Sequence, residues 1–169
     1  MSTASLLTSL LHYNAWANRE LLSELQRLDP HAQQAELHAA LRILNHIHVV
    51  ERIFVANLQG LPHAYTATNT EQTPTLEALQ QAVQSTDRWY LDYVAGLSAE
   101  QLGEIIAFTF VDGDSGRMSR EEMLAHIVTH SGYHRGAVGR LMAQLSLAPP
   151  RDIYSRFVHE AEPERRQPA

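Results

Sequence analysis

The segment from Ser119 to Leu145 constrains the fold most, because it has the periodicity of a long helix with a marked start. Ser119 and Glu122 have the spacing of a capping box, in which each side chain accepts a hydrogen bond from the other residue's amide. Apolar residues then recur three or four positions apart, at Met123, Ile127, Val138, Leu141 and Leu145. The pattern predicts one long amphipathic helix.

Two histidines fall on the apolar stripe of this helix. Counting by three or four from Ile127, the next stripe positions are 130 and 134, and both hold histidine. Four-residue spacing puts two side chains one turn apart on the same face. Two such imidazoles can reach one metal ion, as in the H-E-x-x-H motif. His130 and His134 therefore predict part of a metal site, and a structural histidine cluster at a dimer interface is the alternative.

Three glycines interrupt the same helix, at positions 132, 136 and 139. A glycine in a helix interior costs about 1 kcal/mol relative to alanine. We expect close approach of a neighbouring helix to offset this cost.

Three more helical patterns precede this segment. Apolar residues recur at helical spacing over residues 3–28 and 33–58, and the two patterns end at Asp29-Pro30 and at Gly60. The third pattern runs to about Leu97, with Thr73 read as its N-cap and Pro74 at the first helical position.

The remaining segments predict smaller elements. Residues 105–111 have strand character, and Arg117-Met118 can return after the turn at 112–116, which predicts a short β-hairpin before the last long helix. Residues 152–161 predict a short terminal helix, and a flexible tail follows from about residue 162. With four long helices, the expected fold is all-α, a four-helix bundle in a single domain of residues 1–169.

Composition and charge narrow the function classes. A formal charge of -6 argues against a nucleic-acid partner, because binding the phosphate backbone needs a basic surface. No apolar run approaches the roughly 18 residues of a membrane span, and the N-terminus lacks the pattern of a secretory signal. These features predict a cytoplasmic protein that binds neither nucleic acid nor membrane.

The chain has no cysteine and ten histidines. Metal ligands must then be His, Asp or Glu, and such ligands suit Zn, Ni, Fe or Mn. Any thiol chemistry needs a small-molecule thiol from outside the protein.

The residues alone leave the third ligand open. His46 and His48 lie on the helix predicted over 33–58, but they are about 200° apart around its axis, so at most one can face a given site. His126 lies one turn before His130 and also competes. If the second and fourth long helices pack together, His46 can complete a set of three protein ligands with open positions, which is typical of catalytic sites.

Polar residues elsewhere are candidates for supporting roles. Asn14 and Asn18 lie on the buried face of the first helix, where amides need hydrogen-bond partners. They are either a packed pair or an outer shell of a polar site, where Asn14 could orient a substrate. Tyr133 and Glu51 are candidates for proton transfer, but no catalytic residue is strongly marked.

Three segments resemble the DinB-like (damage-inducible protein) family, within the wider DinB/YfiT-like group of metalloenzymes. They are residues 13–22, 44–54 and 126–136. The resemblance implies an up-down-down-up bundle, commonly dimeric, with a divalent ion, Zn or Ni, held by His46, His130 and His134. It leaves His48 and His126 outside the ligand set. Members often have His and Gln where this chain has Tyr133 and Ala137.

The resemblance implies a divalent-metal-dependent enzyme. Relatives include thiol-dependent transferases and isomerases that use mycothiol, bacillithiol or glutathione. The expected activity is thiol S-transfer, or hydrolysis, through a metal-bound thiolate or water. The alternatives are a non-catalytic homodimeric metal-binding stress protein and, more weakly, a small-ligand-binding bundle without metal.

Overall fold

Capping groups and apolar periodicity set the bounds of four long helices in the computed structural model, which describes residues 2–166. These helices are α1 (Thr3–Leu25), α2 (Gln34–Gln59), α3 (Leu76–Ala95) and α5 (Arg120–Gln144). The Ser119–Glu122 capping box at the start of α5 is confirmed. Gly60 ends α2 with a positive φ of 66°, which glycine adopts without a steric cost.

Two predicted helix ends are wrong by a few residues. The N-cap of α3 is Thr75 rather than Thr73, because the Thr75 hydroxyl accepts the hydrogen bond from the Ala78 amide. Helix α1 stops at Leu25, three residues before the predicted end, and a turn leads from there to Asp29.

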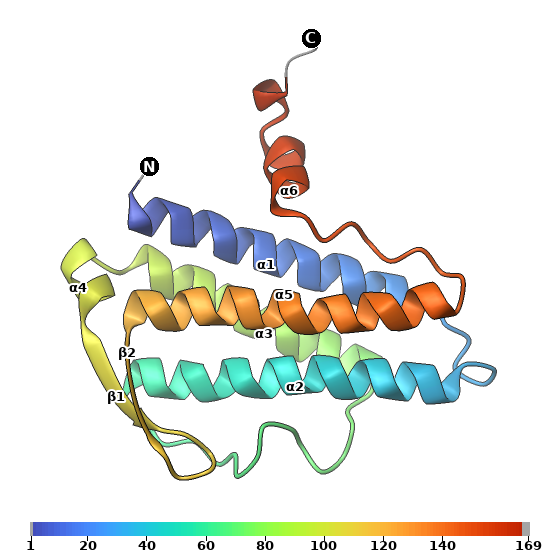
Figure 1. Ribbon diagram of the computed structural model, residues 1–169, viewed down its shortest axis with the longest axis horizontal. Coiled ribbons are helices and arrows are strands. Elements are labelled where there is room, and N and C mark those ends of the chain that lie inside the picture. The colour runs from blue at the N-terminus through green and yellow to red at the C-terminus, as the bar shows by residue number, and fades with distance from the viewer. Residues whose placement is uncertain (1, 167–169) are drawn as a thin grey trace.

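The four long helices form the predicted bundle, with α1 and α5 running in one direction and α2 and α3 in the other (Figure 1). In sequence order this is the up-down-down-up arrangement. Each helix packs against two others, in the pairs α1–α3, α3–α2, α2–α5 and α5–α1. The second and fourth long helices are therefore neighbours, as a shared histidine site requires.

The predicted hairpin is also present. After the short helix α4 (Ala99–Gly103), strand β1 (Ile105–Thr109) pairs antiparallel with β2 (Ser115–Ser119), with Ile105 opposite Ser119. Both strands contact the bundle, β1 against α2 and β2 against α5. This contact supports a two-stranded sheet that would be marginal alone.

The C-terminal segment runs back along the bundle from the end of α5 (Figure 1). It leads to α6 (Tyr154–Ala161), which packs against α1 through aromatic contacts of Tyr13 and Trp16 with Phe157. Within the tail predicted from residue 162, Pro163–Arg165 form one 3₁₀ turn, η1. Residues 167–169 of that tail lie outside the described part of the chain.

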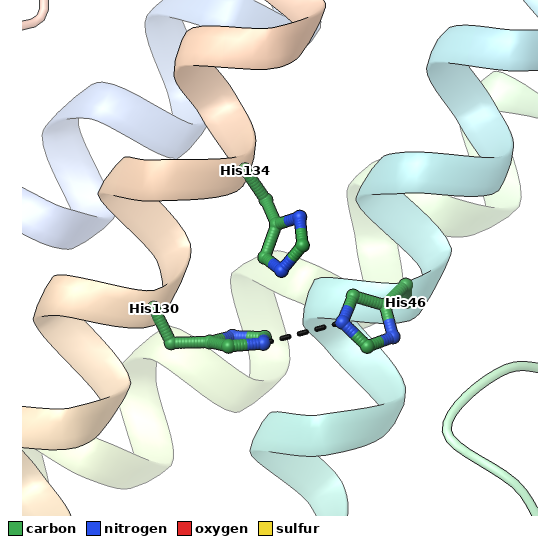
Figure 2. A group of neighbouring side chains, drawn as sticks. All are labelled: His46, His130 and His134. Carbon is green, nitrogen blue, oxygen red and sulfur yellow. Dashed lines mark hydrogen bonds between the residues drawn. The ribbon is translucent and has the colours of Figure 1, made fainter.

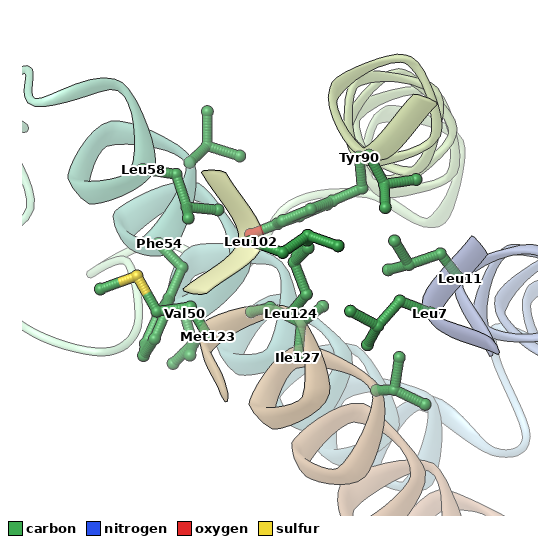
Figure 3. Packing of buried hydrophobic residues seen from close by; sticks show 13 residues of the cluster. Leu7, Leu11, Val50, Phe54, Leu58, Tyr90, Leu102, Met123, Leu124 and Ile127 are labelled. Carbon is green, nitrogen blue, oxygen red and sulfur yellow. The ribbon is translucent and has the colours of Figure 1, made fainter. Parts of the chain in front are cut away.

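Two apolar clusters fill the bundle, one toward the hairpin and one toward the opposite end. The first includes Leu7, Phe54, Tyr90 and Ile127 (Figure 3), and the second includes Leu22, Leu41, Val83 and Val138. Burial of each large side chain contributes about 1.5–3 kcal/mol. Between the clusters, every long helix contributes buried polar residues: Asn14, Asn18, Glu51, Thr86, Asp87, Ser131 and Arg135.

The buried stripe of α5 differs from the prediction at its centre. From Ile127 it continues through Ser131 and Arg135 to Val138, and not through positions 130 and 134. His130 and His134 are half-buried at the edge of this face. Within residues 2–166, no helix is both long and apolar enough to cross a bilayer.

Candidate metal centre

Three histidines from two helices meet between α2 and α5. His46 of α2 and His130 and His134 of α5 each offer one ring nitrogen, and these nitrogens all lie within 4.8 Å of one another. The three rings point into the same space between the helices (Figure 2). The structure therefore brings together the three residues that the family resemblance implies.

The connection between α2 and α3 fixes the ring of His46. His46 Nδ1 lies 2.8 Å from the carbonyl oxygen of Thr68. A carbonyl only accepts, so Nδ1 carries the proton and Nε2 is left with a free lone pair. Asn45 and Asn69 hold this connection against α2, through Asn45 Nδ2 to Thr70 Oγ1 at 2.6 Å and Asn69 Nδ2 to the Arg42 carbonyl at 2.9 Å.

The geometry fits a divalent cation. His46 Nε2 is 3.2 Å from His130 Nε2, and two nitrogens bound to one tetrahedral zinc ion at 2.0–2.1 Å would be roughly 3.3 Å apart. Burial, followed by the neighbouring His134, His126 and His46, lowers the pKa of His130 to about 3. Burial and His46 also lower the pKa of His134. Neutral imidazole is the form that binds metal, so these two histidines are ready to act as ligands at neutral pH.

The competing histidines lie outside this set. His48 lines a different surface pocket with Asn45, Tyr65 and Pro74, and its burial lowers its pKa to about 4. His126 stacks on Phe54 at a centroid distance of 4.8 Å. Its ring lies 5.2 Å from that of His130, yet it does not join the group of three.

The two weak catalytic candidates have different surroundings. Tyr133 is 79% exposed, and its ring meets that of His134 edge-on at 5.1 Å. Asn14 is buried, and its amide oxygen accepts a hydrogen bond from Arg135 Nη1 at 2.5 Å. This agrees with the interpretation of Asn14 and Asn18 as packed amides with partners.

Arg135, directly after His134, is the centre of the buried polar layer. Its side chain is 1% exposed. It donates from Nη1 to the amide oxygens of Asn14 and Asn18, and from Nε to Asp152 Oδ2 at 2.8 Å. Sequence reasoning missed this residue, although its spacing of four from Ser131 and three from Val138 places it on the buried face.

Two buried carboxyl groups belong to the same layer. Glu51 is fully buried; its Oε1 accepts from Ser131 Oγ at 2.9 Å, and Asn14 Nδ2 lies 3.5 Å away. Burial and the nearby Asp87 raise the pKa of Glu51 to about 8. Burial also raises the pKa of Asp87 to about 6, against hydrogen bonding from Asn18 and the charge of Arg135. Glu51 thus keeps its proton at neutral pH.

The substitution Glu51→Gln is expected to make stability less dependent on pH. Glu51 ordinarily titrates at 4.5 and in the folded protein at about 8, so between these values the unfolded chain releases a proton that the folded protein keeps. The wild type therefore loses stability as pH rises through this window, by an amount on the order of 2–4 kcal/mol from this group. Urea unfolding at pH 5 and pH 8 measures the difference. Equal losses in wild type and variant would contradict the buried, protonated Glu51.

The expectation of close helix approach at the glycines of α5 is wrong. Among residues 2–166, a Cβ built on Gly136 would meet no atom within 4 Å, and one on Gly132 would meet only the Arg135 side chain, at 3.8 Å. At Gly139 the near neighbour is Pro149 of the C-terminal segment, at 3.4 Å. Gly136 and Gly139 instead line a surface pocket, together with Leu21 of α1 and Pro149 of the returning chain.

Comparison with known proteins agrees with the family resemblance of the sequence. The model of the DinB family matches residues 1–167. The chain is also similar to the protein DinB of Bacillus subtilis (strain 168), with 20% identity in a match that covers 92% of this chain and 95% of the relative.

Proposed function

The chain belongs to the DinB family, and from this membership we propose that it is a divalent-metal-dependent enzyme. The observation that carries the proposal is the convergence of His46, His130 and His134, with 3.2 Å between the Nε2 atoms of the first two. We assign these three residues as the ligands of a zinc or nickel ion. All three are only half-buried, so a small molecule has access to the site.

The proposed reaction is S-transfer from a small-molecule thiol or, alternatively, hydrolysis. A divalent ion with three protein ligands supplies open coordination positions and lowers the pKa of a ligated water or thiol. In the S-transfer form, the sulfur loses its proton to solvent and bonds to an electrophilic carbon, and the leaving group departs with the bonding electrons. The protein's part is to orient the site, through the Thr68 carbonyl on His46 and the neutral rings of His130 and His134.

One observation favours a second candidate, a homodimeric metal-binding stress protein without turnover. Among the described residues, those that line the pocket touching His46 and His130 include no carboxylate that could act as a general base. The buried Glu51 is held by Ser131 and has no exposed surface. Metal binding alone would need only the three imidazoles.

Protein purified without a nickel column is expected to carry close to one divalent ion per chain. Elemental analysis measures the content, and removal by a chelator should lower the melting temperature, because the ion binds only the folded state. Trace metal alone at neutral pH, with no change in melting temperature on adding Zn²⁺ or Ni²⁺, would overturn the ligand assignment.

Turnover separates the two candidates. The metal-loaded protein is incubated with low-molecular-weight thiols and a panel of alkyl, aryl and acyl electrophiles, and product is followed by mass spectrometry. Metal-dependent product formation, absent in His130→Ala and retained in His48→Ala, would support the enzyme. Full metal occupancy without turnover on any pair would favour the binding protein.

A further inference from the structure

A cavity of about 300 Å³ opens beside the histidine cluster, between α2, α5 and the β-hairpin. We call it the hairpin pocket. His46 and His130 form one side, Phe54 and His126 lie along it, and Phe108 and Met118 come from the two strands. The volume is at the lower end of small-molecule sites and suits a compact group.

The hairpin wall is built from aromatic rings that depend on one glycine. Phe108 lies 4.9 Å from Phe110, edge to face, and 6.0 Å from Phe54. A Cβ on Gly116, in the facing strand, would lie 2.6 Å from Phe108 Cζ and 2.8 Å from Phe110 Cε2. A side chain at position 116 would therefore displace both rings. Because Gly116 has no side chain, the rings of Phe108 and Phe110 have room to form this wall.

Apart from three histidines, the described residues that line this pocket are apolar or uncharged. Of the thirteen lining residues, seven are apolar, three are histidines and three are uncharged polar residues. A carboxylate or ammonium group placed among the apolar residues of this pocket, away from the histidines, would lose water without gaining an ion-pair partner, which is unfavourable. Asn57, one of the polar three, has a buried Nδ2 without a hydrogen-bond partner in the described structure.

We infer that the hairpin pocket binds the apolar, aryl-sized body of an uncharged substrate whose small polar head group lies at His46 and His130. The inference rests on the proposed function, because it takes the three histidines as the metal site. It adds the substrate class: the charged parts of a cosubstrate such as glutathione lie outside this pocket.

Cobalt-substituted protein tests the inference by spectroscopy rather than by activity. Co²⁺ at the three histidines gives visible d–d absorption, and a thiolate that joins it adds a charge-transfer band in the near ultraviolet. Two thiols are titrated: 2-mercaptoethanol, which has no apolar body, and 2-phenylethanethiol, which has an aryl body. In the wild type the aryl thiol should bind about tenfold more tightly or better, since its ring is buried in the pocket.

Two variants alter the wall without touching the histidines. Phe108→Ala removes a ring, and Gly116→Val pushes Phe108 and Phe110 aside. Both should reduce the preference for the aryl thiol to less than about threefold while the affinity for 2-mercaptoethanol stays within about twofold. Phe157→Ala on α6 removes a half-buried ring elsewhere and should keep the preference. Unchanged d–d absorption shows that each variant is folded at the site.

The outcomes separate this inference from the proposed function. Equal affinity for the two thiols in the wild type, or the same preference in all variants, would overturn the hairpin pocket as a substrate site and leave the metal site intact. The absence of d–d bands, or of a charge-transfer band with either thiol, would overturn the open metal site and with it this inference.

Discussion

Replacing His130 by alanine is expected to lower the affinity for Zn²⁺ by at least about 100-fold, more than the loss of an outer hydrogen-bond partner usually causes. His130 Nε2 lies 3.2 Å from His46 Nε2, and its ring is 4.5 Å from that of His134, so it faces both other candidate ligands. The variant leaves only two imidazoles. Competition of metal-free protein with a chromophoric chelator for Zn²⁺ measures the change.

His48→Ala is the matched control for this experiment. His48 is also a half-buried histidine, two residues from His46 on α2, but it faces another pocket. Its variant should bind Zn²⁺ with wild-type affinity. Loss of binding in His48→Ala together with retention in His46→Ala would show that the wrong residue of α2 has been assigned.

Arg135→Met should reduce the free energy of unfolding by about 3–5 kcal/mol at pH 7, the range seen when one partner of a buried ion pair is removed. The substitution leaves Asp152 without its cation and the amide oxygens of Asn14 and Asn18 without a donor. Loss of the positive charge also removes the attraction that lowers the pKa values of Glu51 and Asp87. Urea unfolding followed by circular dichroism measures the effect.

Arg140→Met gives the comparison for this variant. Arg140 is on the same helix, but it is exposed, and substitutions of that kind usually change stability by less than about 0.5 kcal/mol. A loss of less than about 1 kcal/mol in Arg135→Met would mean that the polar layer does not depend on its cation.

The helices and hairpin could be predicted because their signals are local. The Ser119–Glu122 capping box and Gly60 each act within one turn of the chain, and both are found where expected. Thr73 was the wrong cap because Thr75 has the same side chain two positions later, and only the position of Leu76 and Leu79 against the core decides between them.

The candidate site depended on longer-range information. Periodicity placed His130 and His134 on the core-facing stripe, but Ser131 and Arg135 occupy it. Both can be buried there because they donate hydrogen bonds to acceptors on three other segments. Only the family resemblance separated His46 from His48 and His126. The Thr68 contact could not be foreseen, since a backbone carbonyl leaves no mark in the sequence.

The parallel course of α2 and α3 sets a minimum length for the segment that joins them. The 26 residues of α2 rise about 39 Å, and the chain must travel most of that length back before α3 begins. Residues 60–75 can stretch to at most about 55 Å. Little slack remains, so a deletion of more than about four residues from this connection would pull Thr68 away from His46 or unwind the start of α3. Loop shortening is usually a harmless way to stiffen a protein, but the connection between α2 and α3 is too nearly taut to be shortened by this amount.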